Sequence, residues 1–180
     1  MIRIALLGGP GSGKTTQSTG VFTACKTDSV LIRYVQEWVV EAFDDNSLPK
    51  ENAWTQLLIY QKQKKKEECI PKEIKYMITD SPTLLCYIYT LWKAKIPEDN
   101  SLIIDIYEKF LNDLSVYDHI FVCKREKEYI NDGTRYQTKE EAEKLDRLII
   151  HTLEQHHVKY HIIEGDTTKR TEQIRKIVGI

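Results

Sequence analysis

Short apolar runs alternate along the chain with longer segments whose apolar residues recur at helical spacing. The short runs are rich in β-branched and aromatic residues and predict five strands, at residues 2–7, 30–35, 76–79, 119–123 and 160–163. The periodic segments predict helices at residues 14–25, 36–43, 53–69, 83–95, 102–114, 139–156 and 168–178. Strands that alternate with helices predict an α/β fold: a five-stranded parallel sheet with helices on both faces.

Local signals support several of these boundaries. Thr138 and Glu141 have the spacing of a capping box, which predicts that a helix begins just after Thr138. Pro71 ends the helix predicted at residues 53–69, and residues 44–49 have the composition of a loop. The chain contains no internal repeat, low-complexity segment or interdomain linker. We therefore expect a single domain over residues 1–180.

Composition and charge narrow the class of protein. The 180 residues are 41% hydrophobic and 29% charged, as in a globular domain with a substantial core. The net charge of −1 argues against duplex DNA or an anionic membrane as a partner. The four cysteines are far apart, as for reduced thiols, and no apolar run approaches the length of a membrane span. We expect a cytoplasmic protein, and the composition leaves its oligomeric state open.

The most specific motif follows directly after the first predicted strand. Residues 8–15 read Gly-Gly-Pro-Gly-Ser-Gly-Lys-Thr and match the phosphate-binding pattern G-x-x-x-x-G-K-[ST]. Glycines let the backbone N–H groups curl around phosphate oxygens, and the following helix presents its positive end to the same anion. Lys14 can reach the β/γ-phosphates and Thr15 can ligate Mg²⁺. The sequence therefore predicts that ATP and Mg²⁺ are bound, with contacts from Gly8, Gly11, Ser12, Gly13, Lys14, Thr15 and Thr16.

Two carboxylates follow predicted strands, at the edge where parallel sheets bind ligands. Asp80 ends the third strand and can hold Mg²⁺ together with Thr15; the alternative is that it caps the next helix. Glu37 follows the second strand and can accept the proton of a hydroxyl nucleophile; the alternative is a solvated glutamate on a short helix.

A basic segment after the fourth strand has the composition of a lid. Residues 124–137 include Arg125, a glycine at position 133 and Arg135. A guanidinium that arrives when a lid closes can stabilise the charge on a transferred phosphoryl group. Arg135 is the first candidate for this role and Arg125 the second, as a nucleotide contact. The alternative is an exposed turn with ordinary surface charges.

The helix predicted at residues 53–69 changes character along its length. Gln56 and Gln61 lie on its apolar part, where a carboxamide can bind the edge of a substrate, and Trp38 can form a wall of the same pocket. Core packing is the alternative for Trp38. The basic run at residues 62–66 is followed by Glu67 and Glu68, so we expect a solvated helix end rather than a nucleic-acid site.

These residues together resemble kinases of the ribosylnicotinamide type, the kinase domain of bacterial NAD-biosynthesis regulators. The resemblance covers nearly the whole chain: the phosphate loop, Glu37, the glutamine-bearing helix, Asp80, Tyr117-Asp118 before the fourth strand, and Asp132-Gly133-Thr134-Arg135. It implies a three-layer P-loop NTPase fold and phosphotransfer from ATP to an acceptor. The family has a tryptophan shortly before the Asp-Gly-x-Arg motif, where this chain reads Tyr129-Ile130-Asn131, and Asp80-Ser81-Pro82 resembles the Glu-Arg-Ser signature of deoxynucleoside kinases.

We therefore expect a Mg-ATP-dependent phosphotransferase that acts on a nucleoside or nucleotide-like small molecule. In this hypothesis Lys14, Glu37, Asp80 and Arg135 are catalytic, and Glu37, Trp38, Gln56 and Gln61 contact the acceptor. A nucleoside monophosphate kinase is the alternative within the class, because Arg33, Arg125 and Arg135 could clamp a phosphate. A nucleotide-switch or ATPase module that acts on a partner protein, or a nucleic-acid end or base kinase, are alternatives of other classes.

Overall fold

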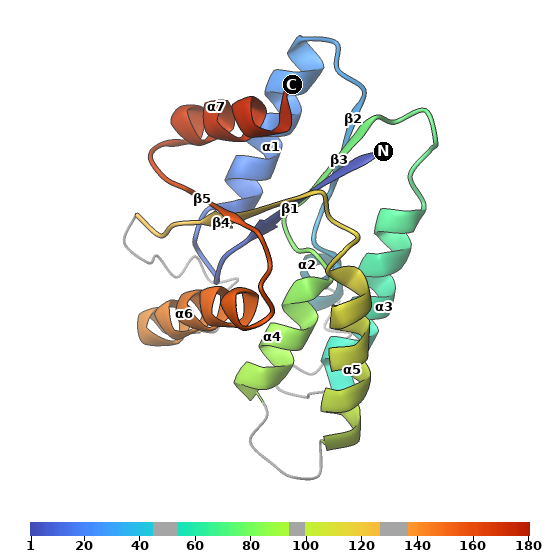
Figure 1. The fold of residues 1–180 in the computed structure, drawn as a ribbon, viewed down its shortest axis with the longest axis vertical. Helices are drawn as coiled ribbons and strands as arrows, with labels where there is room; N and C mark the ends of the chain where they lie inside the picture. Colours follow the sequence, from blue (N-terminus) through green and yellow to red (C-terminus); the bar gives the residue numbers. More distant parts are fainter. Residues whose placement is uncertain (45–53, 94–99, 127–136) are drawn as a thin grey trace.

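A five-stranded, all-parallel sheet forms the centre of the molecule in a computed structural model that describes residues 1–44, 54–93, 100–126 and 137–180. The strands lie in the order β2-β3-β1-β4-β5 (Figure 1). Their bounds are β1 Ile2–Leu7, β2 Ile32–Val35, β3 Tyr76–Thr79, β4 His119–Cys123 and β5 His161–Ile163. The predicted five-stranded parallel sheet is therefore confirmed.

Helices cover both faces of this sheet, as Figure 1 shows. One face is covered by α1 (Lys14–Thr27) and α7 (Thr167–Val178), which also pack on each other. The other face is covered by α4 (Leu84–Lys93), α5 (Asn100–Asp113) and α6 (Lys139–Gln155). Outside these, α3 (Trp54–Glu68) packs on α4, and the short α2 (Trp38–Asp44) follows β2. The three layers of the expected fold are present.

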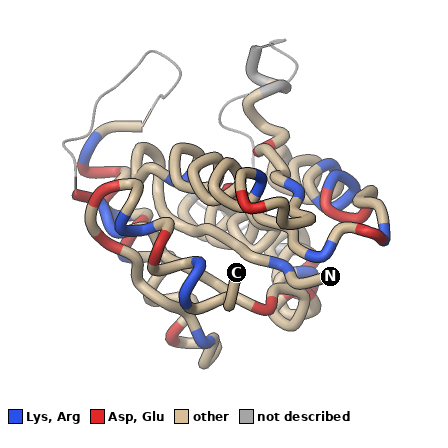
Figure 2. Tube along the Cα trace, turned by 90° about the horizontal axis from the view of Figure 1, so that it is seen from above, with Lys and Arg blue, Asp and Glu red and all other residues tan. Residues whose placement is uncertain are grey.

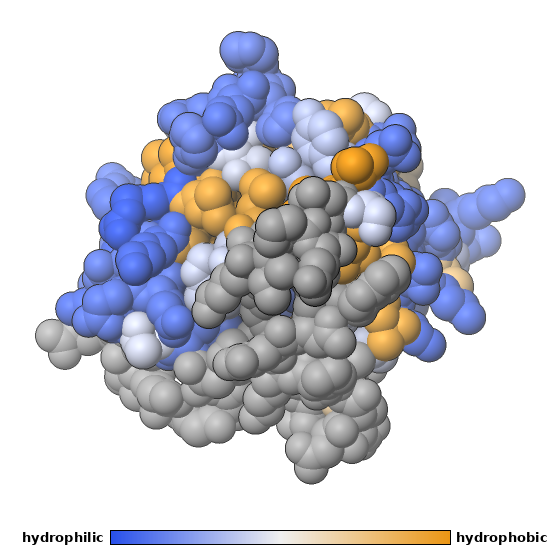
Figure 3. Space-filling view, turned by 90° about the horizontal axis from the view of Figure 1, so that it is seen from below, coloured by the Kyte–Doolittle hydropathy of each residue, from blue (hydrophilic) through white to orange (hydrophobic). Residues whose placement is uncertain are grey.

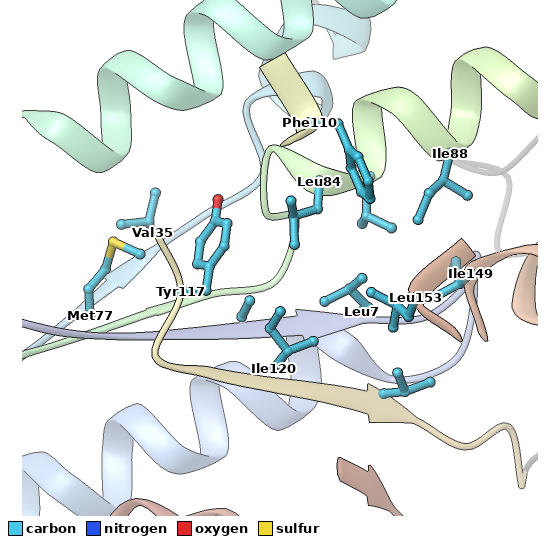
Figure 4. Packing of buried hydrophobic residues seen from close by; sticks show 13 residues of the cluster. Leu7, Val35, Met77, Leu84, Ile88, Phe110, Tyr117, Ile120, Ile149 and Leu153 are labelled. Atoms are coloured by element: carbon cyan, nitrogen blue, oxygen red, sulfur yellow. The ribbon is translucent and has the colours of Figure 1, made fainter. Parts of the chain in front are cut away.

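The central strand β1 shows why its sequence is continuously apolar. Successive side chains of a strand point to opposite faces, so Leu7 packs under α4 and α6 while Leu6 packs under α1 and α7. Both are fully buried, as is typical of a parallel strand covered on both sides. Figure 4 shows the first of these two cores, with Leu7 beside Leu153 of α6 and Ile149 of the same helix beyond it.

Most element boundaries agree with the sequence patterns to within two residues. The predicted bounds of β3 and β4 are unchanged, and the Thr138–Glu141 capping box is formed in both directions. One strand, β2, begins two residues late, because the N–H of Val30 donates to the Cys25 carbonyl and so extends the C-terminal turn of α1. The predicted loop at residues 44–49 lies, apart from its first residue, outside the described residues.

The register of the sheet brings the ends of neighbouring strands together. Thr79, the last residue of β3, pairs with Ala5 of β1 and with Val35, the last residue of β2. The segments that follow β1, β2, β3 and β4 therefore leave the sheet at one edge, where ligands of such folds bind.

The surface of the described part is mixed in charge and mostly hydrophilic. Lys and Arg residues are interspersed with Asp and Glu along the trace (Figure 2). On the face shown in Figure 3, apolar residues form areas of limited extent between hydrophilic ones. Among the described helices, none combines the length and the apolar character needed to cross a bilayer.

Candidate active site

The segment between β1 and α1 forms a tight loop whose shape requires glycine. Gly8 has a φ of 151°, and a Cβ there would lie 2.4 Å from Ser12 Oγ. Gly13 is the N-cap of α1 in the left-handed conformation, with a φ of 89° and no side chain that caps the helix. The first N–H groups of α1 are therefore left to a ligand, which is the arrangement that binds phosphate.

Lys14 folds back over this loop. Its Nζ donates to the carbonyls of Gly8, at 2.7 Å, and Gly9, at 3.1 Å. The ammonium group therefore lies over the loop in which a phosphate chain would bind, and it can exchange these carbonyls for phosphate oxygens. Thr15 and Thr16, on the first turn of α1, are both exposed. All three residues lie at the loop, and the roles predicted for them stay predictions.

The outer side of the loop is held by Arg125, which the sequence singled out as a nucleotide contact, and by two residues that sequence reasoning missed. Asp146 of α6 accepts a hydrogen bond from the Gly9 N–H at 2.6 Å and another from Arg125 Nε at 2.8 Å. Arg125 also donates to the Pro10 carbonyl, and Arg170 of α7 donates to the Ser12 carbonyl at 3.3 Å. Neither Asp146 nor Arg170 belongs to a recognisable motif, because each reaches the loop only through tertiary packing.

Asp80 lies on the other side of the site, directly after β3, and is only 1% exposed. Its Oδ2 accepts a hydrogen bond from the Tyr34 hydroxyl at 2.8 Å, and its Oδ1 accepts one from the Glu37 N–H at 3.1 Å. Both bonds come from β2 and the segment that follows it. The helix that Asp80 supports is therefore α2, and not α4 as the N-cap alternative assumed.

Glu37 is half-buried at the start of α2. Burial raises the pKa of its carboxyl group, and the nearby charge of Asp80 raises that pKa further. Lys14 and a hydrogen bond from Ser81 act in the opposite direction but do not cancel the rise in pKa. Glu37 thus interacts electrostatically with the lysine of the phosphate loop from the facing side. The solvated glutamate of the alternative interpretation does not describe this environment.

One glutamine of α3, Gln63, contacts the chain neighbours of Glu37 and Asp80. Its Oε1 accepts a hydrogen bond from the Trp38 N–H at 2.9 Å, and its Nε2 donates to Thr79 Oγ1 at 3.3 Å. The predicted Gln56 is buried, whereas the predicted Gln61 is exposed and lies on another face of α3. The structure therefore does not bring Gln61 to the site. The side chain of Trp38 is half-buried.

The expected solvated helix end is wrong for two of its residues. Gln63 and Glu67 are 2% and 0% exposed. They continue the buried stripe of α3 that begins at Gln56 and Ile59, at helical spacings of three and four residues. The charged residues that surround these positions obscure the stripe in the sequence.

A cavity of about 770 Å³ adjoins the phosphate loop at the ends of β4 and β5. Cys123, Ile150 and Ile162 contribute apolar surface to it, and Arg125, Asp146 and Glu164 contribute charge. An apolar space with a charged rim beside a phosphate site fits a flat heterocycle carried on a phosphate chain.

Two sequence predictions remain without a geometric test. Arg135 and the rest of the predicted lid beyond residue 126, up to residue 136, lie outside the described residues.

For Mg²⁺, the predicted ligands are oxygen donors, as this ion prefers. Thr15 presents an exposed hydroxyl. Both oxygens of Asp80 already accept hydrogen bonds, so Asp80 fits an ion held through water rather than directly. In the described segments, no three His, Cys, Asp or Glu residues gather as a metal site would require.

Solved structures with the same fold match 99% of the chain. NadR protein in complex with NR matches with a TM-score of 0.78 and 17% identity, and the chain spans 52% of that protein chain, about half its length. Deoxyadenosine kinase from M. mycoides with bound dATP matches with a TM-score of 0.67 and 16% identity over 100% of its chain. Thymidylate kinase from Ehrlichia chaffeensis matches with a TM-score of 0.67 and 18% identity over 98% of its chain. The fold of the P-loop nucleoside and nucleotide kinases is thereby confirmed.

Sequence comparison tests the family more directly than structural likeness at such low identities. No curated protein gives a significant match to the chain. A family model described as an AAA domain matches residues 3–170, which is nearly the whole chain and includes the phosphate loop, Glu37, Asp80 and Asp146. The chain belongs to this AAA-domain family.

Proposed function

We propose that the protein is a Mg-ATP-dependent kinase that phosphorylates a hydroxyl group of a nucleoside-like small molecule. The observation that carries the proposal is the position of Glu37, a half-buried residue that directly follows β2 and donates its N–H to Asp80 at 3.1 Å. The pKa of its carboxyl group is raised, and the charge of Lys14 of the phosphate loop acts on that group. A carboxylate whose pKa is raised is a stronger base than an ordinary glutamate, and so better suited to accept a proton from a hydroxyl nucleophile.

The phosphate loop supplies the donor side of the reaction. The free N–H groups at the start of α1 bind the phosphates of ATP, and Lys14 neutralises charge that develops on the β/γ oxygens. Thr15 would hold Mg²⁺ directly and Asp80 would hold it through water; the bound ion neutralises charge on the β- and γ-oxygens. The cavity beside the loop accommodates the base of the nucleotide.

On the acceptor side, a proton is transferred from the acceptor hydroxyl to Glu37. The acceptor oxygen attacks the γ-phosphorus of ATP, its proton passes to the carboxylate of Glu37, and the bond from the γ-phosphorus to the bridging oxygen breaks. ADP leaves with the electron pair of that bond. Ser81 and the Glu37 N–H bond to Asp80 fix the base for this transfer. Arg135 is expected to reach the transferred phosphoryl group when the lid closes.

Electrostatics favour a hydroxyl acceptor over a phosphate acceptor. Glu37 and Asp80 lie side by side where the acceptor would enter, and two carboxylates repel the dianion of a nucleoside monophosphate. Among the arginines that suggested a phosphate clamp, Arg33 is exposed on the edge strand β2 and Arg125 is engaged with Asp146. Structural neighbours support both classes: one holds NR, one is a deoxyadenosine kinase, and one is a thymidylate kinase.

Two alternatives of other classes receive less support. A nucleic-acid kinase is disfavoured by the net charge of −1 and by the mixed charges of Figure 2. A nucleotide switch that acts on a partner protein would have no need of a base such as Glu37 opposite the phosphates. We also propose, from composition, that the protein works in the cytoplasm.

A screen for phosphorylated products tests the proposal. The protein is incubated with Mg-ATP and, separately, with nucleosides, deoxynucleosides, ribosylnicotinamide, nucleoside monophosphates and an oligonucleotide, and the products are identified by mass. We expect a monophosphate product from at least one nucleoside-like acceptor and none with Lys14→Ala. Conversion of ATP to ADP and inorganic phosphate with no phosphorylated acceptor in the whole panel would contradict the proposal.

A further inference from the structure

Peptide geometry links the outer and inner sides of the phosphate loop. In a planar trans peptide, the carbonyl of one residue and the N–H of the next point in opposite directions. A contact that fixes a loop carbonyl outward therefore turns the following N–H inward, toward the space that a phosphate occupies. Contacts on the outside of the loop can thus decide how many N–H donors face the ligand.

Two arginines make such contacts at alternate residues. Arg125 Nη2 donates to the Pro10 carbonyl at 2.8 Å, which directs the N–H of Gly11 the other way. Arg170 Nη1 donates to the Ser12 carbonyl at 3.3 Å, which does the same for the N–H of Gly13. Arg170 is only 7% exposed, and its Nη2 is fixed by the Lys124 carbonyl at 2.6 Å.

Asp146 completes the arrangement at the loop entrance with the opposite polarity. Its Oδ1 accepts the N–H of Gly9 at 2.6 Å, so this N–H points outward. The carbonyl of Gly8 in the same peptide then points inward, and Lys14 Nζ does donate to it at 2.7 Å. Asp146 Oδ2 meanwhile accepts Arg125 Nε at 2.8 Å and so orients the guanidinium that contacts Pro10.

The contact between the loop and α6 is close. A Cβ on Gly9 would lie 2.8 Å from the Ala142 carbonyl and 2.8 Å from Asp146 Oδ1. The loop therefore rests directly on α6, whose start is fixed by the Thr138 capping box. The side chains of Arg125 and Asp146 are only 11% and 21% exposed, so solvent weakens their ion pair less than it would on the surface.

We propose that Asp146, Arg125 and Arg170 are positioning residues that hold the phosphate loop in the conformation that binds the phosphate chain of ATP. The inference rests on the proposed function for the identity of the ligand. None of the three residues needs to touch the nucleotide for this role. The effect on phosphate affinity is then the opposite of what charge repulsion alone predicts. Asp146 is an acidic residue beside an anion site, yet its presence increases the affinity of that site for phosphate.

The direction of this change in affinity can be tested with inorganic tripolyphosphate, which has the phosphate chain of ATP but no nucleobase. Removal of a nearby negative charge strengthens anion binding if charge alone matters. Under our proposal, Asp146→Asn instead weakens tripolyphosphate binding about tenfold, as expected when charge-assisted hydrogen bonds that order the site are lost. The matched control is Glu154→Gln on the same helix, an exposed residue that loses the same charge far from the loop.

A double-mutant cycle tests whether Asp146 and Arg125 act as one unit or independently. We expect Arg125→Gln to weaken tripolyphosphate binding by a similar factor, and the double variant to be no weaker than the single ones, because both changes break one unit. In the kinase assay, KM for ATP should rise while KM for the acceptor stays unchanged, a split that general destabilisation would not produce.

The outcomes separate this inference from the proposed function. Tighter or unchanged tripolyphosphate binding by Asp146→Asn, or additive effects in the cycle, would overturn the positioning role. Asp146→Asn keeps the size and shape of the side chain, so it carries the test if Arg125→Gln fails to fold. A wild-type protein that binds tripolyphosphate but phosphorylates no acceptor would overturn the proposed function alone, because the binding arm still decides the role of Asp146.

Discussion

The two sides of the candidate active site are held by opposite chemistry. On the phosphate side, the guanidinium groups of Arg125 and Arg170 donate to backbone carbonyls, so that the N–H groups of Gly11 and Gly13 are left for an anion. Asp146 accepts the Gly9 N–H only at the entrance of the loop. On the acceptor side, the carboxylate of Asp80 and the carboxamide of Gln63 accept the N–H groups of Glu37 and Trp38. One side therefore presents donors and the other presents a carboxylate acceptor, which is the polarity that transfer of a phosphoryl group to a hydroxyl requires.

The acceptor side also rests on a buried network of polar side chains. The Tyr117 hydroxyl donates to Glu67 Oε2 at 2.8 Å and accepts the Thr83 N–H at 3.0 Å, while Thr83 Oγ1 donates to Asp113 at 2.6 Å. This network joins α3, α5 and the start of α4 beneath the Asp80–Ser81 segment. The buried carboxyl group of Glu67, whose pKa burial raises, makes the acceptor side the more sensitive to pH.

The largest expected effect lies on the phosphate side. Lys14→Ala should lower turnover by roughly a hundredfold or more, because the lysine neutralises charge that builds up on the β/γ oxygens in the transition state. Steady-state kinetics with a saturating acceptor measure this loss. Turnover close to that of the wild type would place ATP elsewhere and remove the basis of the comparison.

Glu37→Gln should lower turnover with a hydroxyl acceptor by roughly a hundredfold and leave ATP binding unchanged. Since the base works only when ionised and its pKa is raised, wild-type turnover should fall as the pH decreases through that raised pKa, at a higher pH than for an ordinary glutamate. A pH–rate profile should show this acid limb for the wild type and lose it in the variant. An identical limb in both proteins would assign it to another group.

Arg135, predicted from the sequence, would add a cation that reaches both sides. Arg135→Ala should lower turnover by roughly a hundredfold with a modest change in KM for ATP. Arg135→Lys should recover only part of the activity, since an ammonium group cannot form the planar bidentate contact of a guanidinium. Full activity in both variants would mean that the lid lies elsewhere.

Gln63 sharpens the comparison within the acceptor side. Gln63→Leu leaves the Trp38 N–H without its acceptor, which should displace Glu37 and lower turnover about tenfold while KM for ATP stays unchanged. Gln61→Leu, on the exposed face of the same helix, should have little effect on the same kinetic constants. The reverse order of effects would restore Gln61 as the acceptor contact and remove Gln63.

The smallest effect on activity, but a clear one on stability, is expected at Glu67. Burial raises its pKa to about 7, with Asp113 also raising it and Tyr117, Arg3 and Lys64 opposing. Because the folded state then binds a proton that the unfolded state releases, stability should fall as the pH rises from about 4.5 to about 7, by on the order of 3 kcal/mol.

The isosteric Glu67→Gln cannot lose a proton, so it should remove most of that fall while keeping an acceptor for Tyr117. Urea unfolding of both proteins at about pH 5 and about pH 8 measures the difference. Parallel pH dependence of the two proteins would show that Glu67 is already ionised at low pH in the folded state.

The sequence was sufficient for the sheet, the helices and the residues at the strand ends. Hydrophobic period and the glycine pattern are local properties, which is why the phosphate loop could be recognised, and Glu37 and Asp80 proposed as site residues, without a structure. The partners of these residues could not. Asp146 and Arg170 lie more than a hundred positions from the loop they contact, and the bonds that Asp80 makes to β2 depend on strand order.

The charged half of α3 shows a different limit of sequence reasoning. Its run of Lys and Glu residues indicates a solvated surface, yet Gln63 and Glu67 are buried because α4 and α5 pack on α3. Their hydrogen-bond partners are Trp38, Thr79 and Tyr117, which lie on other elements of the chain. Burial of a polar residue is decided by partners from other elements, and these leave no local signal in the chain.

Transfer of labelled γ-phosphate tests the central claim most directly. Wild type and Glu37→Gln are each given γ-labelled ATP with a nucleoside acceptor found in the screen or with its monophosphate, and the label in each product is counted. Our account predicts that the wild type labels the nucleoside in preference to the monophosphate, and that Glu37→Gln loses labelling of the nucleoside while still binding ATP. Preferred labelling of the monophosphate, with no difference between the two proteins, would contradict it.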